Sequence, residues 1–141
     1  LLTRIAKCCK PIPGDDILGY ITQGRGVSIH KKNCSNISQL DDQIENRLIQ
    51  VSWDQKHPGS YYADIQVRAF GREDLLKEVT SLLSNAKIDL IAFNSLINKT
   101  NNMLYITMTI QIHDVTQLNE LMNQIKQLPN VIHVTRLGEH K

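Results

Sequence analysis

Residues 104–112 carry the strictest pattern in the chain, an uninterrupted alternation of apolar and polar side chains. Successive side chains of a β-strand point to opposite faces, so this alternation predicts a strand with one apolar face and one wet face. The predicted wet face bears Tyr105, Thr107, Thr109 and Gln111. A strand of this kind is typical of an antiparallel sheet that is covered on one side only.

The segments around this strand are spaced as regularly. Residues 65–69 alternate like a strand, and residues 88–97 and 131–137 are typical of two more strands. Two stretches follow helical spacing, with apolar residues at Leu75, Leu76, Val79, Leu82, Leu83 and Ala86, and at Leu118, Leu121, Met122, Ile125 and Leu128. Asp114, followed by Gln117 three residues later, has the form of a capping box for the second helix.

Residues 61–138 therefore have the element order β-α-β-β-α-β. Right-handed crossovers fold this order into a four-stranded antiparallel sheet with both helices on one face, the ferredoxin-like arrangement. We predict an α+β protein whose second domain, residues 61–138, has this fold. The fold alone does not identify an activity, because it hosts many.

Residues 1–55 form a predicted β-rich module that is irregular by comparison, with Pro and Gly between short apolar runs. Three short strands are expected, at residues 17–22, 27–30 and 48–53, and a short helix at residues 33–40. A module with so small a core is marginal by itself and benefits from a staple. Residues 54–60, which contain Pro58 and Gly59, are the predicted linker between the two domains.

Four soft metal ligands lie in this first module: Cys8, Cys9, His30 and Cys34. Three thiolates and one imidazole are a common structural zinc set. His30 and Cys34 are four residues apart and share a face if the turn between them is helical. Cys8 and Cys9 are adjacent, and adjacent side chains diverge in regular structure, so both can bind one ion only if the backbone bends. Three residues close behind them favour such a bend: Pro11, Pro13 and Gly14.

The alternative is that the thiols are small buried side chains and that His30 is a structural residue. Three cysteines do not form a closed disulfide framework, because the number is odd. The chain starts at Leu1 without an apolar signal segment, and no apolar run approaches the ~18 residues that cross a membrane. We therefore expect a fragment of a longer cytoplasmic protein, in which thiols stay reduced.

The formal net charge of +2 is too small to argue for or against a nucleic-acid partner. Residues 1–34, however, hold six Lys or Arg and two Asp, a local charge of +4, whereas residues 61–141 are neutral. One hypothesis is an RNA-binding face in which basic side chains and exposed glycine amides contact phosphates. Its residues would be Lys7, Lys10, Arg25, Lys31 and Lys32 together with Gly24 and Gly26. The alternative is an ordinary solvated basic face.

No catalytic constellation is recognisable in the sequence. It has no phosphate-binding loop, no Ser/His/Asp order and no paired carboxylates in an apolar frame. Asp15 and Asp16 follow Pro13-Gly14, which predicts a turn. We therefore expect this chain to bind or regulate and to carry no catalytic residues of its own.

The first module closely resembles one known family. The resemblance is carried by Cys8-Cys9-Lys10-Pro11-Ile12-Pro13-Gly14-Asp15-Asp16-Ile17, by Ile21-Thr22-Gln23-Gly24-Arg25-Gly26, and by His30 and Cys34. These residues are similar to the C-terminal regulatory region of long RelA/SpoT-type stringent-response proteins, closer to the RelA synthetase branch. Residues 1–55 resemble the module called the zinc-finger or ribosome-intersubunit domain, and residues 61–138 resemble the ACT (RRM-like) domain.

The resemblance implies a parent enzyme, a GTP pyrophosphokinase that transfers pyrophosphate from ATP to the 3′-hydroxyl of GDP or GTP with Mg²⁺. It leaves open whether the parent also hydrolyses (p)ppGpp. It implies that this cytoplasmic region docks on the ribosome, at 23S rRNA, and senses uncharged tRNA during amino-acid starvation. It also implies structural Zn²⁺ at the four positions Cys8, Cys9, His30 and Cys34.

ACT domains that bind amino acids typically read Asp-Arg-x-Gly-Leu-Leu where the first strand meets the first helix. This chain reads Gly71-Arg72-Glu73-Asp74-Leu75-Leu76. The usual Asp is Gly71 and the usual Gly is Asp74, so we expect this ligand loop to hold no amino acid. Two alternatives stay open: an amino-acid sensor in which Asp74 takes over the ammonium contact, and a homodimerisation module that pairs through strand edges without contacting RNA.

Overall fold

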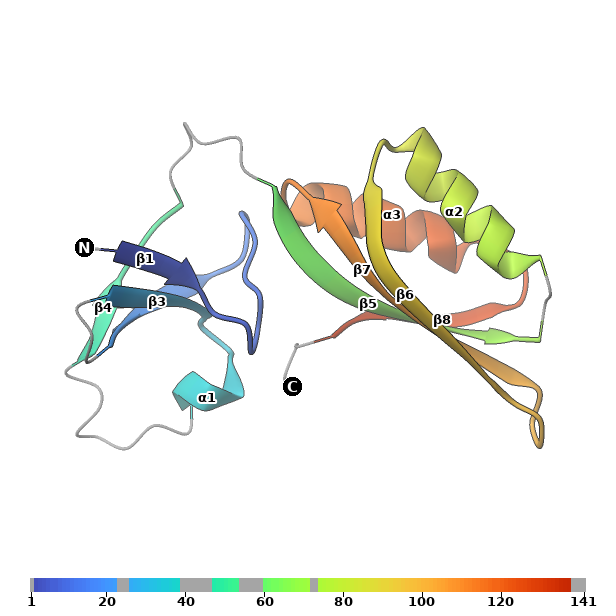
Figure 1. The fold of residues 1–141 in the computed structure, drawn as a ribbon, viewed down its shortest axis with the longest axis horizontal. Coiled ribbons are helices and arrows are strands. Elements are labelled where there is room, and N and C mark those ends of the chain that lie inside the picture. Colours follow the sequence, from blue (N-terminus) through green and yellow to red (C-terminus); the bar gives the residue numbers. More distant parts are fainter. Residues whose placement is uncertain (1, 23–25, 39–46, 54–59, 72–73, 138–141) are drawn as a thin grey trace. The chain divides into compact units, whose positions relative to one another are not determined.

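The computed structural model describes residues 2–22, 26–38, 47–53, 60–71 and 74–137. These residues form two compact units, the first made of residues before Ser60 and the second of Ser60–Leu137 (Figure 1). Four features expected from the sequence lie outside the described residues: the tip of the turn at 23–25, the end of the short helix beyond residue 38, the linker at 54–59, and Arg72 with Glu73.

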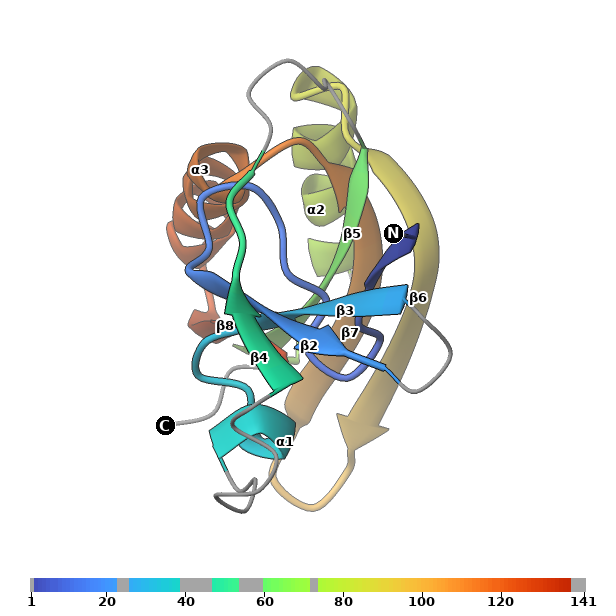
Figure 2. The same cartoon turned by 90° about the vertical axis from the view of Figure 1, so that its left-hand side faces the viewer.

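The first unit is built on a four-stranded sheet (Figure 2). Its strands are β1 (Leu2–Ile5), β2 (Ile17–Ile21), β3 (Gly26–Lys31) and β4 (Leu48–Gln50), in the order β1-β3-β2-β4, and the one-turn helix α1 (Ser35–Ser38) follows β3. β1 runs parallel to β3, whereas the other pairs are antiparallel. The strands expected at 17–22 and 27–30 are confirmed, and the strand expected at 48–53 ends earlier. The sequence pattern did not predict β1.

The two faces of this small sheet carry different side chains. One face holds the apolar cluster of Ile17, Val27 and Ile29, against which Ile5, Ile49, Val51 and Trp53 pack. The other side holds Ala6, Cys9 and Cys34, packed against Leu18, Tyr20 and Leu48. The cysteines therefore occupy the place of a second apolar layer, which is what a module with little apolar mass needs from a staple.

The second unit is a four-stranded antiparallel sheet with both helices on one face (Figure 1). Its elements are β5 (Tyr61–Phe70), α2 (Leu75–Asn85), β6 (Asp89–Asn98), β7 (Met103–Ile112), α3 (Val115–Lys126) and β8 (Val131–Arg136). The strand order is β6-β7-β5-β8, and every pair is antiparallel. The predicted ferredoxin-like arrangement and the α+β class are confirmed.

The core of this unit lies between the sheet and the helices. Along β7 the side chains alternate between buried and half-buried, as the sequence pattern predicts, and Ile106, Met108 and Ile110 are fully buried. The helices add Leu75, Val79 and Leu83 from α2, and Leu118, Leu121 and Ile125 from α3. No helix among the described residues is long and apolar enough to cross a membrane.

The predicted cap of α3 by Asp114 is confirmed, and the return hydrogen bond of the capping box is made with the residue before the cap, His113. The Asp114 carboxylate accepts a hydrogen bond from the Gln117 backbone N–H at 2.8 Å. The Gln117 side chain in turn accepts one from the His113 backbone N–H at 2.7 Å. Two N–H groups that the helix itself cannot satisfy are thereby paired, which fixes where α3 begins.

Candidate metal centre

Cys8 and Cys9 lie in a tight turn directly after β1. The Ala6 N–H donates to the Ile29 carbonyl at 2.9 Å, which extends the contact between β1 and β3. The Lys10 N–H then donates back to the Ala6 carbonyl at 3.0 Å, and Lys10 has φ 45°, in the left-handed region. This closed turn is the backbone bend that two adjacent ligands require.

His30 and Cys34 come together through the end of a strand and a turn, without a helix between them. His30 lies in β3, not in a helix, and Cys34 follows a turn closed by its own N–H, which donates to the Lys31 carbonyl at 3.0 Å. The Lys32 N–H donates to the Asp16 carbonyl at 2.8 Å and ties this turn to the segment before β2. The two side chains therefore converge without the helical turn that would have placed them on one helix face.

The four ligand atoms stand at the corners of a compact tetrahedron. The Cys8 sulfur lies 3.8 Å from the Cys9 sulfur, 3.5 Å from the Cys34 sulfur and 3.4 Å from His30 Nδ1. The Cys9 sulfur lies 3.8 Å from His30 Nδ1, and all four atoms are within 4.8 Å of one another. Tetrahedral zinc with ordinary bond lengths requires about 3.8 Å between two sulfurs and about 3.6 Å between sulfur and nitrogen. The donor set and the spacing therefore both fit a structural zinc ion.

Burial and hydrogen bonds together shift the pKa values of the cluster. Burial raises the pKa of the Cys9 thiol to about 12, even though the Lys31 backbone N–H donates to that sulfur at 3.3 Å. Burial would raise the pKa of Cys8 as well, but hydrogen bonds with Asn36, Cys34 and Cys9 outweigh it and the pKa is lowered. Burial also lowers the pKa of His30, which keeps the imidazole neutral and able to ligate. A cation at the centre would offset the cost of the Cys9 thiolate.

The expected RNA-binding residues do not form one exposed group. Lys7 and Lys32 are exposed and Lys10 is half-buried, whereas Lys31 is only 4% exposed. The reason is strand alternation, because β3 places Lys31 on the side that carries Val27. The structure thus removes Lys31 from the exposed basic set.

Two further features reduce the number of proposed RNA-binding groups that are available to a phosphate: a glycine amide that is already hydrogen-bonded, and acidic side chains near Lys32. The Gly26 N–H donates to Thr22 Oγ1 at 3.2 Å, so it does not point freely at a phosphate. Gly24 and Arg25 lie outside the described residues. Lys32 also borders a surface hollow of about 290 Å³ that contains two carboxylates, lined by Gly14, Asp15, Asp16, Lys31, Lys32 and Asn33. Of the proposed basic residues that the structure describes, Lys7 and Lys32 are exposed to a partner and Lys10 is half-buried.

Asn102 lies next to Gly71, the first residue of the ACT-type ligand loop, and this contact could not be predicted from the loop sequence. The Gly71 N–H donates to the Asn102 carbonyl at 2.8 Å. A Cβ at Gly71 would lie 2.6–2.8 Å from the side-chain atoms of Asn102, so that side chain occupies the space of an aspartate there. Asp74 precedes α2 and makes no side-chain capping hydrogen bond. Arg72 and Glu73 lie outside the described residues.

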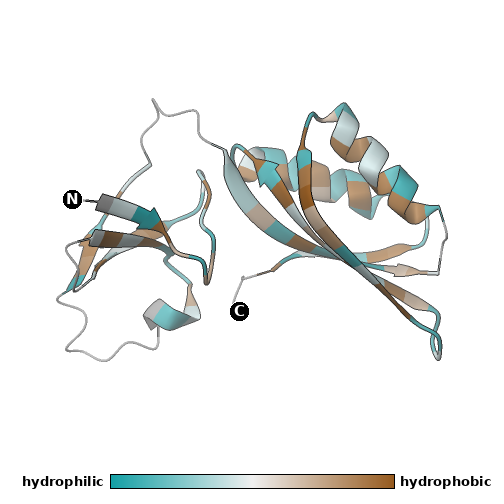
Figure 3. Cartoon of the chain, in the orientation of Figure 1, coloured by the Kyte–Doolittle hydropathy of each residue, from teal (hydrophilic) through white to brown (hydrophobic). Residues whose placement is uncertain are grey.

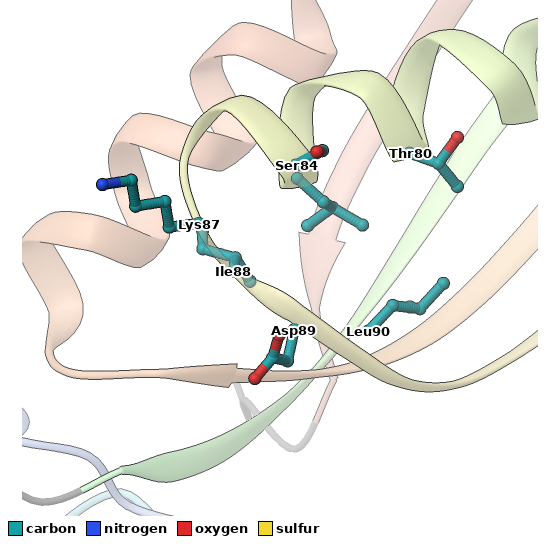
Figure 4. A pocket seen from close by; sticks show the side chains of 7 residues that line it. Thr80, Ser84, Lys87, Ile88, Asp89 and Leu90 are labelled. Carbon is teal, nitrogen blue, oxygen red and sulfur yellow. The ribbon is translucent and has the colours of Figure 1, made fainter.

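Sequence reasoning did not find a second hollow, of about 430 Å³, between the end of α2 and the start of β6 (Figure 4). It is lined by Thr80, Leu83, Ser84, Lys87, Ile88, Asp89 and Leu90. In Figure 4 the ends of the Lys87 and Asp89 side chains, the two charged groups of the lining, lie apart from each other. Its charged groups do not converge on one point, and among the described residues the Cys8, Cys9, His30 and Cys34 cluster is the group arranged to hold a metal.

Comparisons with known proteins agree with the two-unit architecture. Residues 1–54 match the RelA/SpoT RIS domain, and residues 57–136 match the ACT domain. The chain is 34% identical over 137 residues to the GTP pyrophosphokinase of Escherichia coli strain K12 and to the bifunctional (p)ppGpp synthase/hydrolase RelA of Mycobacterium tuberculosis. These matches span 97% of this chain and 18% of each relative.

One similar solved structure is the ACT domain from the GTP pyrophosphokinase of Chlorobium tepidum, with a TM-score of 0.49 and 16% identity. It covers 56% of this chain and 100% of its own. The match to the ACT domain covers more than half of the chain, and the match to the RIS domain covers nearly all of the remainder. The chain therefore belongs to the ACT domain family, and its ACT domain follows a RelA/SpoT RIS domain.

Proposed function

We propose that this chain is a non-catalytic regulatory region of a stringent-response GTP pyrophosphokinase. The proposal is supported by the similarity to such proteins over 97% of the chain, which spans only 18% of their length. The parent would transfer pyrophosphate from ATP to GTP or GDP with Mg²⁺, using residues outside this chain. The RIS and ACT units would dock on ribosomal RNA in the cytoplasm and respond to uncharged tRNA.

The observation that carries the proposal is the tetrahedron formed by Cys8, Cys9, His30 and Cys34. A closed set of four protein ligands leaves no open position for a substrate, so the site is structural and not catalytic. Zinc would cross-link the turn after β1, the end of β3 and the start of α1. A small β-rich unit held in this way can present a rigid surface to a partner.

Replacement of His30 tests the metal site directly. Purified wild-type protein should carry about one zinc per chain. His30→Ala should lose most of it, whereas His133→Ala, a change at an exposed histidine of the second unit, should keep it. Mass spectrometry under native conditions and elemental analysis give the stoichiometry. A wild-type chain without metal after chelator-free purification would contradict the site.

The ribosome proposal rests on the exposed lysines of the first unit. Lys7→Glu with Lys32→Glu should weaken sedimentation with 70S ribosomes, and binding by the wild type should fall steeply with salt because bound phosphates release counterions. The matched control is Lys99→Glu with Lys126→Glu, at two exposed lysines of the neutral second unit. The assay is run with and without deacylated tRNA. Equal losses from both pairs would show that the first unit is not the contact surface.

A second candidate function, self-association, is favoured by the exposed edge strand β6. β6 lies at the edge of its sheet, and much of it is coloured apolar in Figure 3. Four of its large apolar side chains are 48–65% exposed: Ile91, Phe93, Leu96 and Ile97. Residues 90–98 contain no charged side chain, so two copies can approach without like-charge repulsion. An open edge of this kind is a template for another strand.

We propose that two copies pair through β6 in antiparallel orientation, with the two-fold axis at Ser95. This register places Phe93 of one copy opposite Ile97 of the other, on the same face of the joined sheet. Phe93→Lys should turn a dimer into a monomer in light scattering at micromolar concentration. Ile132→Lys, at an apolar side chain of β8 that is also 49% exposed, serves as the control and should stay dimeric. A monomeric wild type would contradict the proposal.

The amino-acid sensor remains the competing function for the second unit. Gly71 provides no carboxylate for a ligand ammonium, and Asn102 occupies the adjoining space. We therefore expect calorimetry with valine, leucine or isoleucine to show no saturable binding near or below about 100 μM, roughly −5.5 kcal/mol. Binding at that strength would replace the docking role of this unit with a sensory one.

A further inference from the structure

The imidazole of His30 is held from both of its nitrogens. Nδ1 faces the sulfurs of Cys8 and Cys9, at 3.4 and 3.8 Å. Nε2, on the far side of the ring, lies 2.9 Å from the hydroxyl oxygen of Ser28. Ser28 precedes His30 by two residues in β3, so the strand places both side chains on one face.

The protonation chemistry of imidazole gives this contact a direction. A neutral imidazole carries one proton, and the nitrogen that binds a metal must present its lone pair. If Nδ1 is the ligand, Nε2 carries the proton and donates it to the Ser28 oxygen. A serine hydroxyl can accept such a hydrogen bond, because its oxygen has two lone pairs.

We propose that Ser28 is a positioning residue for the metal centre: it holds His30 in the Nε2–H tautomer with Nδ1 toward the three cysteines. The inference rests on the zinc site proposed above and extends it by one residue outside the ligand set. Groups that hydrogen-bond to a ligating histidine fix its tautomer and ring orientation, and their loss typically lowers metal affinity about 10–100-fold.

The same hydrogen bond also fixes the rotation of the ring. A half-turn about the Cβ–Cγ bond exchanges Nδ1 with Cδ2 and Nε2 with Cε1. Both the thiol-facing position and the Ser28-facing position would then be occupied by carbon. The contact with Ser28 therefore selects the ring orientation as well as the tautomer and prepares the site for the ion.

The test compares Ser28→Ala with Ser28→Thr and with a control, Ser52→Ala, at an exposed serine of the same unit. Zinc affinity is measured by competition with a chromophoric chelator. We expect a loss of about 10–100-fold for Ser28→Ala, recovery in Ser28→Thr, which keeps the hydroxyl, and no change in Ser52→Ala. Trp53 fluorescence, which reports on the apolar cluster of this unit, verifies that each variant is folded.

A spectroscopic readout separates positioning from general destabilisation. Long-range ¹H–¹⁵N spectra of the zinc-loaded wild type should show His30 bound through Nδ1 with a protonated Nε2. Two results would overturn the role of Ser28 and leave the metal site intact. One is a Ser28→Ala variant that keeps both the wild-type spectrum and the wild-type zinc affinity. The other is a wild-type His30 that binds zinc through Nε2. A wild-type chain that takes up no zinc would instead overturn the metal site on which the inference rests.

Discussion

At the scale of single residues, Gly19 shows how closely the first unit is packed. A Cβ at this position would lie 2.8 Å from Val27 Cγ1 and 2.9 Å from the Cγ1 atoms of Ile49 and Val51. All three neighbours branch at Cβ and belong to or pack on the apolar cluster, so they have few ways to yield. The backbone of β2 thus serves as part of the core surface.

Gly19→Ala should therefore lower the free energy of unfolding of the first unit by about 1–3 kcal/mol, because it overpacks the cluster. Urea unfolding followed by Trp53 fluorescence measures this, since Trp53 packs on that cluster and is the single tryptophan of the chain. Gly71→Ala is the control in the second unit, where the added methyl meets an exposed Asn102 side chain that can rotate. Its cost should stay below about 0.5 kcal/mol in circular dichroism.

The titration of two ligand residues sets the pH range in which the metal-free first unit is stable. The pKa of His30 is lowered from 6.5, so the unfolded chain binds the extra proton first and stability falls as pH drops below about 6.5. The pKa of Cys9 is raised from 9.0 to about 12, so the unfolded chain loses the proton first and stability falls as pH rises above about 9. Stability should be greatest between these limits.

Urea midpoints of metal-free protein at pH 5, 7.5 and 10 measure this dependence through Trp53. His30→Ala should remove much of the loss on the acid side and leave the alkaline side unchanged. An acid loss of the same size in this variant would assign it to other groups.

At the scale of elements, the start of α3 depends on one side chain. Asp114→Ala should lower the free energy of unfolding of the second unit by about 1 kcal/mol, because it leaves the Gln117 N–H without its capping acceptor. Circular dichroism at 222 nm during urea unfolding gives the value. Glu120→Ala, at an exposed position within the same helix, is the control and should change it far less. Equal effects would mean that the cap contributes little.

At the scale of the whole molecule, the two units have separate cores and should respond separately to metal removal. The apolar clusters described for the first unit consist of residues before Asp54. The buried core residues of the second unit all come after Ser60. A chelator should unfold the first unit or lower its midpoint strongly, because metal binding energy in such a module is folding energy. The midpoint of the second unit should not move.

Trp53 fluorescence reports the first unit in this experiment, and helical circular dichroism reports chiefly α2 and α3 of the second. Two transitions are expected in the metal-loaded chain, of which only the fluorescence transition shifts with chelator. One shared transition that shifts as a whole would show that the units unfold together.

Local sequence patterns determine most of the second unit. The alternation of β7, the helical spacing of α2 and α3 and the capping box at Asp114 each depend on residues close in sequence, and the sheet order follows from right-handed connections. Residue types alone also identify the four candidate metal ligands, and the adjacency of Cys8 and Cys9 requires a bend there. These features are local, so the sequence by itself carries them.

Only the tertiary structure decided the features that depend on contacts between distant segments. The pairing of β1 with β3 and the hydrogen bond from the Lys32 N–H to the Asp16 carbonyl have no periodic signature. The same holds for Asn102 beside Gly71. Each results from two segments packing together, and a one-residue change of register reverses which side chains face the core.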